Sequence, residues 1–521
     1  RVASGHPHPK PARSLFCGLG THAFWCKHPE LSSLNLMNDL NRRTFLKTAA
    51  GFGVASTLVR SSAWAQPKGA NDAIRLAIVG LGSKGTSHLR NILKMPDVRI
   101  AGLCDPDESR MARAVRLAQE AGVSPPTALD ARRIFERDDV DAVLIASPDH
   151  WHATHAVWAC QAGKDVYVEK PVANTIWEGR QIIEAGRRHN RIVQAGTQAR
   201  SDPGIQQAVE HVRAGHLGKI LWVHALWYKR REPIGRRLPW YPEGVDFDLF
   251  CGPAPMKPLV RDKLHYDWHW FWETGNGEMT NLGVHCVDMA RWFAGHRGAP
   301  PRVCSVGGRY VVDDSGETPN TQIGVFEYPD IPIIMECRGL PAEPGAEHMD
   351  NFRGIRHGVV VQCEDGYFAG HYGGAVYDNN RKRIQAFPGD GGDGHMANFL
   401  EAVRSRRSDA LAAPIEEAQL SSATCLLANV SHRLGEPAPL EEARAVVDRH
   451  EFSRAAFDNM VTHLGRHGVD LERDRLRVGG WLQVDESGET IAGVGEAPDD
   501  ATLERAHHFA HGIQRPPYVI A

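Results

Sequence analysis

The sequence predicts an α/β protein in which a domain built on a parallel sheet precedes a second domain of mixed helices and strands. Three observations support this prediction. Short β-branched runs alternate with helical stretches between residues 74 and 195, which is the pattern of βαβ units. A glycine-rich turn joins the first of these runs to a helix. Beyond residue 196 the strand candidates follow one another, which is typical of an α+β domain.

Length, charge and cysteine usage narrow the class of protein. The chain has 521 residues, 42% of them hydrophobic, so we expect a buried core and more than one domain. Its 60 Lys and Arg nearly balance its 63 Asp and Glu. Proteins that bind nucleic acid usually carry a surplus of basic residues, so no nucleic-acid partner is expected. The apolar runs are shorter than the ~20 residues needed to span a bilayer, so no stable membrane span is expected. None of the ten cysteines stands in a CxxC pair, so buried thiols are expected rather than a zinc site.

Residues 37–65 have the layout of an export signal. Arg42-Arg43 begins a basic start, a short apolar region follows, and small residues stand before Ala65. The twin arginines resemble a Tat signal. We therefore expect translation to start at Met37, residues 1–36 to be an upstream or disordered leader, and the protein to be periplasmic or exported. The alternative is an uncleaved amphipathic helix that serves as an anchor.

The first predicted strand, residues 74–79, leads into a GxGxxG turn and then into a helix. Gly80 permits the tight turn, Gly82 lets the backbone approach a pyrophosphate, and Gly85 lets the helix pack closely on the strand. The whole turn is Gly80, Leu81, Gly82, Ser83, Lys84 and Gly85. A second strand, 98–104, ends at Asp105, which we expect to bind ribose hydroxyls. A carboxylate there favours NAD, although Lys84 and Arg110 leave NADP open.

Two further strands end in candidate site residues. Strand 140–145 leads to Ser147, Pro148 and His152, and this loop should face the nicotinamide because ligands bind beyond the carboxyl ends of parallel strands. His150, His152 and His155 could suggest a metal site, but no carboxylate or cysteine cluster accompanies them, so no metal is predicted. Strand 165–168 ends at Glu169-Lys170-Pro171. Lys170 is a candidate for binding a substrate oxygen; a surface lysine before a helix is the alternative.

In the second half we expect helices over 206–214, 283–293, 395–405 and 415–433, and strands over 220–227, 303–311, 322–328 and 331–337. On a helix, Asn281, His285 and Asp288 would share one face. This arrangement makes His285 a candidate general base with two polar neighbours, and a satisfied core histidine is the alternative. The aromatic cluster Trp268–Trp272 could stack on a sugar ring or belong to the core.

Together these motifs resemble the Gfo/Idh/MocA oxidoreductases, in particular the longer bacterial members with a Tat signal. The resemblance extends over nearly everything after residue 40. The motifs that carry it are Gly80–Gly85, Cys104-Asp105, Ser147-Pro148 with His152, Ala162-Gly163-Lys164, Glu169-Lys170-Pro171, Gly196-Thr197-Gln198, Gly283–Asp288 and Ala413–Glu417.

The resemblance implies a Rossmann NAD-binding domain over residues 66–195. It also implies a substrate and oligomerisation domain over 196–521 with a large, open-faced, mostly antiparallel sheet. Lys170 and His285 would act on a substrate hydroxyl. The dehydrogenase members usually carry Asp where this chain has Asn281, which puts simple inositol-dehydrogenase-like chemistry in doubt unless Asp288 substitutes.

The expected function is therefore NAD-dependent oxidation of a sugar or polyol by a homo-oligomeric enzyme with tightly bound cofactor. One alternative is a redox-neutral, NAD-dependent glycoside hydrolase or lyase. The other is an exported sugar-binding protein without chemistry. The expected cofactor contacts are Gly80, Leu81, Gly82, Ser83, Lys84, Gly85, Asp105, Ser147, Pro148, His152, Glu169 and Lys170.

Overall fold

Six parallel strands form the first sheet of the computed structural model, which describes residues 73–495 and 499–521. Their order, β3-β2-β1-β4-β5-β6, is that of doubly wound dinucleotide-binding domains. The strands are β1 (Ile74–Val79), β2 (Val98–Cys104), β3 (Thr127–Ala128), β4 (Ala142–Ile145), β5 (Asp165–Val168) and β6 (Val193–Ala195). The predicted strands 74–79, 98–104 and 165–168 are thus confirmed residue by residue. The leader 1–36 and the signal 37–65 lie outside the described residues.

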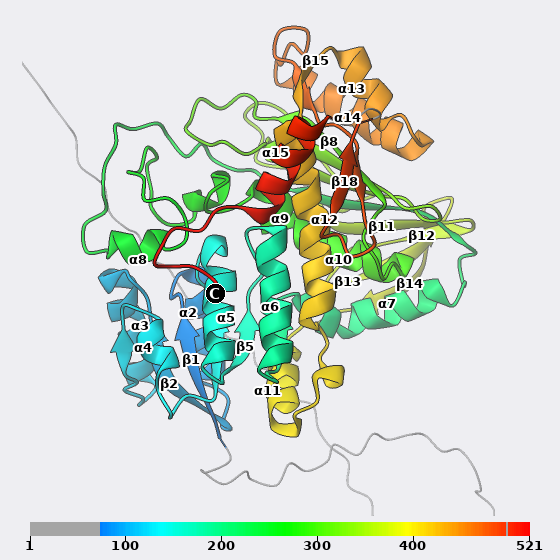
Figure 1. Cartoon of the computed structure of the whole chain (residues 1–521). Coiled ribbons are helices and arrows are strands. Elements are labelled where there is room, and N and C mark those ends of the chain that lie inside the picture. The colour runs from blue at the N-terminus through cyan, green and yellow to red at the C-terminus, as the bar shows by residue number, and fades with distance from the viewer. Residues whose placement is uncertain (1–72, 496–498) are drawn as a thin grey trace, which may run out of the picture. The chain divides into compact units, whose positions relative to one another are not determined.

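Helices cover both faces of this sheet (Figure 1). They are α2 (Ser83–Ile92), α3 (Glu108–Glu120), α4 (Arg132–Phe135), α5 (Asp149–Gln161) and α6 (Ile176–Arg188). Two apolar clusters, one of them built around Val79 and Val143, the other around Leu76 and Leu144, fill the space between strands and helices. Successive residues of a strand point to opposite faces, so both faces are buried and the strands read as continuous apolar runs.

The second sheet has twelve strands, ten of which run in the order β14-β13-β12-β11-β7-β10-β9-β8-β16-β15. Pairing is antiparallel throughout except between β7 and β10, which confirms the expected mostly antiparallel sheet. The strands are β7 (Ile220–Tyr228), β8 (Arg302–Gly308), β9 (Thr321–Glu327), β10 (Ile333–Arg338), β11 (His357–Cys363), β12 (Gly366–His371), β13 (Gly373–Asp378), β14 (Arg383–Pro388), β15 (Glu436–Ala438), β16 (Leu476–Val478), β17 (Leu482–Val484) and β18 (Ile491–Val494).

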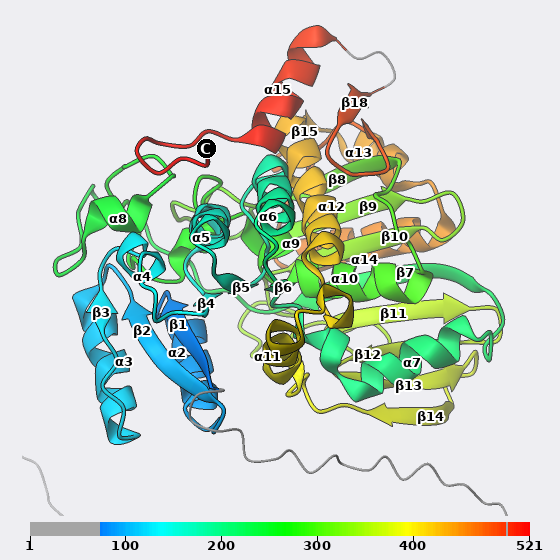
Figure 2. The same cartoon turned by 60° about the horizontal axis from the view of Figure 1, so that its bottom comes forward.

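Three helices, α7 (Pro203–Arg213), α10 (Gly283–Ala294) and α12 (Ile415–Leu434), lie against one face of this sheet (Figure 2). Their apolar residues form the largest core cluster together with inward side chains of β7, β10 and β11. Two further helices, α13 (Leu440–Val447) and α14 (Glu451–Arg466), pack beside β8, β9 and β16 and build a second cluster. The remaining elements are α8 (Phe247–Cys251), α9 (Gly277–Asn281), α15 (Asp500–His511) and the 3-10 turns η1 (Gln198–Ser201), η2 (Asp267–Trp270) and η3 (Ser408–Ala410).

The chain returns to the first sheet after completing most of the second. Helix α11 (His395–Ser405), predicted with these bounds, places Met396, Phe399 and Leu400 in one core with Leu144 and Tyr167. The first domain is therefore completed by residues that stand far beyond residue 195 in the sequence.

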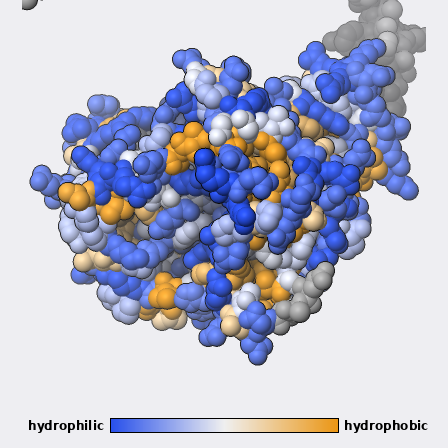
Figure 3. Space-filling view, turned by 90° about the horizontal axis from the view of Figure 1, so that it is seen from above, coloured by the Kyte–Doolittle hydropathy of each residue, from blue (hydrophilic) through white to orange (hydrophobic). Residues whose placement is uncertain are grey.

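The hydrophilic surface and the buried cysteines are what the composition predicts. The face seen in Figure 3 is mostly hydrophilic, with apolar side chains in separate groups. The eight cysteines of the described part are buried and free of disulfides. Within the same residues no helix is long and apolar enough to cross a membrane.

Replacing Gly85 by alanine should destabilise the first domain. A Cβ at this position would stand 1.9 Å from the carbonyl oxygen of Gly80, and neither atom can move without opening the turn. We expect the free energy of unfolding in urea to fall by about 1–3 kcal/mol. Gly465→Ala in α14 is the matched control, because a Cβ there meets no atom within 4 Å and alanine favours a helix. Equal stability of Gly85→Ala and the parent chain would refute the close-packing account.

Candidate functional site

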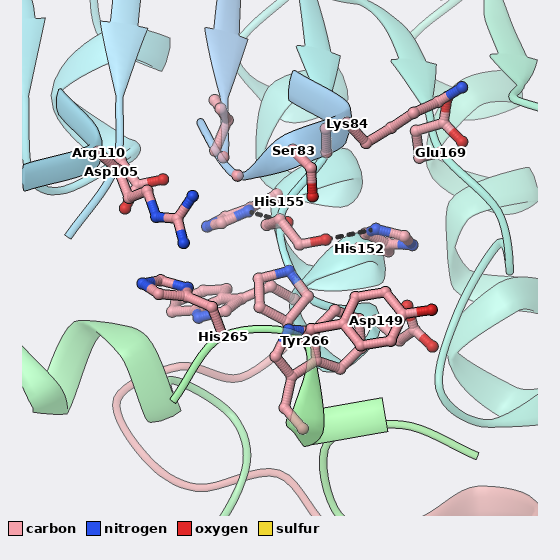
Figure 4. Close-up of a pocket in the computed structure, with 18 of the residues that line it drawn as sticks. Ser83, Lys84, Asp105, Arg110, Asp149, His152, His155, Glu169, His265 and Tyr266 are labelled. Atoms are coloured by element: carbon pink, nitrogen blue, oxygen red, sulfur yellow. Dashed lines mark hydrogen bonds and ion pairs between the residues drawn. The ribbon is translucent and has the colours of Figure 1, made fainter. Parts of the chain in front are cut away.

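A cavity of about 650 Å³ lies beyond the carboxyl ends of β1, β2, β4 and β5. Residues of the second domain close its other side, and Figure 4 shows side chains from both domains facing into it. Ten of the twelve predicted cofactor contacts line the cavity: Gly80, Gly82, Ser83, Lys84, Asp105, Ser147, Pro148, His152, Glu169 and Lys170. The other two, Leu81 and Gly85, do not line the cavity; they are part of the turn and lie on its side away from the cavity.

The glycine turn has the geometry that a dinucleotide requires. Gly80 adopts a φ of 87°, which a residue with a Cβ rarely adopts. A Cβ on Gly82 would meet no protein atom within 4 Å, so this position leaves the backbone open to a ligand. Helix α2 begins at Ser83 and directs its free N–H groups and positive dipole end to the same place. The turn therefore fits a pyrophosphate.

Asp105 braces the turn and faces the cavity. Its Oδ2 accepts a hydrogen bond from the Leu81 N–H at 2.6 Å, and its Oδ1 accepts one from the Asp107 N–H at 2.9 Å. Burial raises the pKa of this carboxyl. Each carboxylate oxygen has a further lone pair with which to accept a ribose hydroxyl. Arg110 lines the same cavity as Asp105 (Figure 4).

Glu169 anchors Lys84 beside the glycine turn. Its Oε1 lies 3.4 Å from the Lys84 Nζ and 2.7 Å from the His88 Nε2, and Gln198 donates to the same oxygen at 3.0 Å. Burial opposes the charged form, but Lys84 and His88 outweigh burial and hold the pKa of Glu169 below its usual range. Glu169 therefore stays ionised and holds Lys84 in place.

The three histidines of α5 tie loops together. The two ring nitrogens of His152 contact the carbonyl oxygens of Pro171 at 2.7 Å and Ser147 at 2.9 Å. The His150 Nε2 contacts the Phe250 carbonyl oxygen at 3.0 Å, and the His155 ring stacks on Trp151 with centroids 4.1 Å apart. The His152 contacts fix the loop after β4 against the loop after β5, and the His150 contact ties α5 to α8. No group of three potential metal ligands occurs in the described part of the chain.

Lys170 reaches across the cavity to the second domain. Its Nζ donates to the main-chain oxygen of Asn281 at 2.5 Å and to the Asn281 Oδ1 at 3.3 Å. The helix face that Asn281 was expected to share with His285 is wrong, because α9 ends at Asn281, whereas α10 begins at Gly283 as predicted. This break leaves the Asn281 carbonyl free to accept the lysine. Burial lowers the pKa of Lys170.

His285 stands in the first turn of α10 and lines the same cavity as Lys170. Its side chain is buried, and its Nδ1 has no hydrogen-bond partner within the described structure. Burial, followed by the charge of Lys170, lowers the pKa of His285 well below the usual histidine value. The ring is therefore neutral near pH 7, which is the form that can accept a proton.

Asp288 does not join His285, which corrects the expectation that it flanks the histidine. Its carboxylate accepts two hydrogen bonds from Arg200, at 2.8 and 2.9 Å, and one from the Ser421 hydroxyl at 2.7 Å. It is fully buried and is not among the lining residues of the cavity. Its role is thus to hold η1 and α12 against α10.

Three lining residues were missed from the sequence. Asp149, the first residue of α5, is buried, and its Oδ2 has no hydrogen-bond partner in the described structure. Tyr266 has a φ of 71°, and its hydroxyl accepts a hydrogen bond from Arg231 at 2.6 Å. Tyr372 comes from the turn between β12 and β13. Of the aromatic cluster 268–272, Trp268 lines the cavity and stacks on His269 with centroids 3.6 Å apart.

Residues 244–272, here called the roof, cover the cavity and are fastened to the first domain. The His265 Nε2 lies 2.6 Å from the Asp107 Oδ2. The Glu108 N–H donates to the Gly244 carbonyl at 3.0 Å, and the Asp246 N–H donates to the Pro106 carbonyl at 2.9 Å. Roof residues Leu249, Phe250, Lys263, Leu264, His265, Tyr266, Trp268 and His269 line the cavity. The roof would therefore contact a dinucleotide bound at the glycine turn.

The C-terminal tail, residues 513–521, holds the roof from outside. The Arg515 guanidinium pairs with the Asp248 carboxylate at 2.6 Å and donates to the Gly252 carbonyl at 3.0 Å. The Tyr518 hydroxyl donates to the same carboxylate at 2.5 Å, while its ring packs edge-on against Trp151 of α5 with centroids 5.3 Å apart. The tail thereby links α8 of the roof to the first domain.

Comparison with known proteins extends this description. Residues 74–197 match the NAD-binding Rossmann-fold model of the Gfo/Idh/MocA oxidoreductase family, and residues 256–346 match a C-terminal domain model of the same family. A glycosyl hydrolase family 109 protein of Shewanella pealeana is 28% identical over 228 residues, which are 39% of this chain and 50% of that protein. Inositol 2-dehydrogenase 2 of Saccharopolyspora erythraea is 28% identical over 224 residues, which are 43% and 54%.

The chain spans about half the length of these curated relatives. A levoglucosan dehydrogenase in complex with NADH and L-sorbose superimposes with a TM-score of 0.52 at 16% identity, over 68% of this chain and 94% of that one. This likeness shows a common fold. The glycine turn, Asp105 and the match over residues 74–197 agree on an NAD-binding Rossmann domain, and two separate parts of the chain resemble the Gfo/Idh/MocA family.

Proposed function

We propose that this protein oxidises a CH–OH group of a sugar or polyol with NAD held in the cavity. The observation that carries the proposal is that Lys170 from one domain and His285 from the other line a single cavity with the dinucleotide-binding turn. The names of two relatives, an inositol dehydrogenase and a levoglucosan dehydrogenase, support a polyhydroxylated substrate.

The two residues have complementary parts in this chemistry. NAD, when bound, supplies the acceptor for the hydride of the CH–OH carbon. The neutral His285 ring takes the hydroxyl proton, because burial keeps the ring unprotonated before the substrate binds. The Lys170 ammonium, oriented by Asn281, donates to the substrate oxygen and stabilises negative charge that develops there.

The enclosure of the cavity supports a cofactor that stays bound between turnovers. The roof crosses the cavity and is fastened at Asp107, and the tail fastens the roof again at Asp248. Retention suits the export predicted from residues 37–65, because a free nicotinamide pool is not expected outside the cytoplasm. A second substrate would then regenerate the cofactor on the protein.

A second candidate is redox-neutral cleavage of a glycosidic bond. In that reaction, transient oxidation acidifies the neighbouring C–H, elimination breaks the bond, and the hydride returns, so no net oxidation occurs. The observation that favours it is Asp149, a buried carboxylate in the cavity that has no partner in the described structure. The name of the relative from Shewanella pealeana agrees with this candidate.

Breaking the contacts of the tail should speed the loss of cofactor. The double variant Arg515→Ala with Tyr518→Phe removes both side-chain bonds to Asp248. Because a hydrogen bond to a charged group contributes about 1.5–3 kcal/mol, we expect NAD to dissociate at least about tenfold faster in a competition assay. Arg505→Ala, in the exposed part of α15, is the control and should leave the rate unchanged. Equal rates for all three proteins would exclude a tail that holds the roof.

Substitution of Lys170 or His285 should abolish chemistry while NAD remains bound. For Lys170→Met and His285→Asn we expect reduction of the bound nicotinamide by myo-inositol or levoglucosan to fall by about 100-fold or more. Absorbance of the reduced nicotinamide measures this rate, and product analysis separates the two candidates, since a free sugar without net oxidation indicates cleavage. Unchanged activity of Lys170→Ala would exclude Lys170 from the reaction, and absence of any product from the parent protein would indicate a sugar-binding module.

A further inference from the structure

Asp149 has surroundings that a structural aspartate would not have. It is the first residue of α5 and follows the N-cap residue Pro148, a position that lies at the positive end of the helix dipole. Its side chain is 3% exposed, and no hydrogen bond satisfies its Oδ2 within the described structure. Buried carboxylates are almost always paired. An unpaired one that lines a cavity calls for a donor that arrives with a ligand.

The other carboxylates of the cavity all have partners. Asp105 accepts two backbone N–H groups, Asp130 is paired with Arg132 at 2.7 Å, and Glu169 is held by Lys84 and His88. The His269 ring is also engaged, because its Nδ1 lies 2.5 Å from the Tyr266 carbonyl oxygen, and burial lowers its pKa to about 3. Asp149 is thus the lining carboxylate left free to move a proton.

Lys170 and Asp149 both line the cavity, and the charge of each one favours the charged form of the other. Burial raises the pKa of Asp149 to about 8, with Lys170 acting in the opposite direction. Burial lowers the pKa of Lys170, and Asp149 is the first charge that counters this effect. A carboxyl group whose pKa lies near the working pH can both accept a proton and return it.

We propose that Asp149 is the base that removes the proton from the carbon next to the oxidised carbon of the sugar. The inference rests on the proposed oxidation, which creates the ketone that acidifies this C–H bond. His285 is already committed to the proton of the hydroxyl, so a second acceptor is required. Asp149 is the free carboxylate that shares the cavity with Lys170 and His285.

The step balances within the cavity. The Asp149 carboxylate takes the proton, the C–H electron pair becomes a carbon–carbon double bond, and the carbonyl pair moves onto oxygen, where the Lys170 ammonium stabilises it. The enolate then either recovers its proton or expels the oxygen substituent two carbons from the carbonyl. In the second case the proton held on Asp149 passes to the departing oxygen, so the same residue serves as base and then as acid.

Hydrogen exchange on a ready-made ketone tests this role without any hydride transfer. The probes are the inositol ketone inosose and a methyl glycoside oxidised at one ring hydroxyl, each incubated in D₂O with the NAD-loaded protein and followed by NMR. We expect the parent protein to exchange the C–H next to the carbonyl of at least one probe. For Asp149→Asn this exchange should fall at least about 100-fold, with the same NAD content and thermal unfolding temperature. Asp149→Glu, which keeps the carboxylate, should restore part of the exchange.

Asp500→Asn is the matched control, since Asp500 is the first residue of α15 and is exposed; it should exchange like the parent. Undiminished exchange by Asp149→Asn would overturn the proposal. So would loss of NAD from that variant, which would make Asp149 a residue that positions the cofactor. Absence of exchange by the parent protein would overturn it as well, and if that protein still reduced its NAD with sugars, the proposed oxidation would stand alone.

Discussion

The hydrogen bond from the Lys170 ammonium to the main-chain oxygen of Asn281 joins the two domains at the wall of the cavity that both residues line. It depends on the break between α9 and α10, which frees that carbonyl. It also depends on β5 ending where it does, because the strand delivers Lys170 to the carboxyl edge of the sheet. The electrostatics of the site follow from this closure: a lysine, a histidine and an aspartate are buried together, and burial is the largest cause of the shift in each pKa.

Closure of the site involves segments that are far apart in the sequence. The roof contacts the rim of the first domain at Asp107, and the tail reaches the outer side of the roof at Asp248. Helix α11 completes the core beneath the first sheet. The first domain is therefore completed by residues 395–405 and contacted by the tail through Tyr518.

Much of the fold could be predicted from local pattern. The strands 74–79 and 98–104, the glycine turn and helix 395–405 all have strong local signals, and their bounds are confirmed. Gly80 and Gly82 could be placed in the site because the spacing of GxGxxG between strand and helix has a single geometric meaning. Lys170 and His285 required the resemblance to a family, since Lys170 alone is better explained as a surface lysine and His285 alone equally well as a core histidine.

The rest of the site depended on tertiary contacts, which the spacing of residues along the sequence does not reveal. Asp288 has helical spacing from His285, but Arg200 arrives from another segment and takes its carboxylate. Asn281 was placed on the same helix face as His285, although the predicted helix began only at Gly283, where α10 does begin. Asp149 was overlooked because an acid in the first turn of a helix is ordinarily explained by the helix dipole. The lack of a hydrogen-bond partner for its Oδ2 becomes visible only in three dimensions.

The measurement that tests the central claim most directly is the nucleotide content of the protein purified without added cofactor. The protein would be denatured, and any released nicotinamide nucleotide would be identified and quantified against the chain. A cavity enclosed by roof and tail predicts NAD in a near-stoichiometric amount. Protein that is folded, retains sugar-dependent activity only when NAD is added, and releases no nucleotide would contradict the account of a retained cofactor.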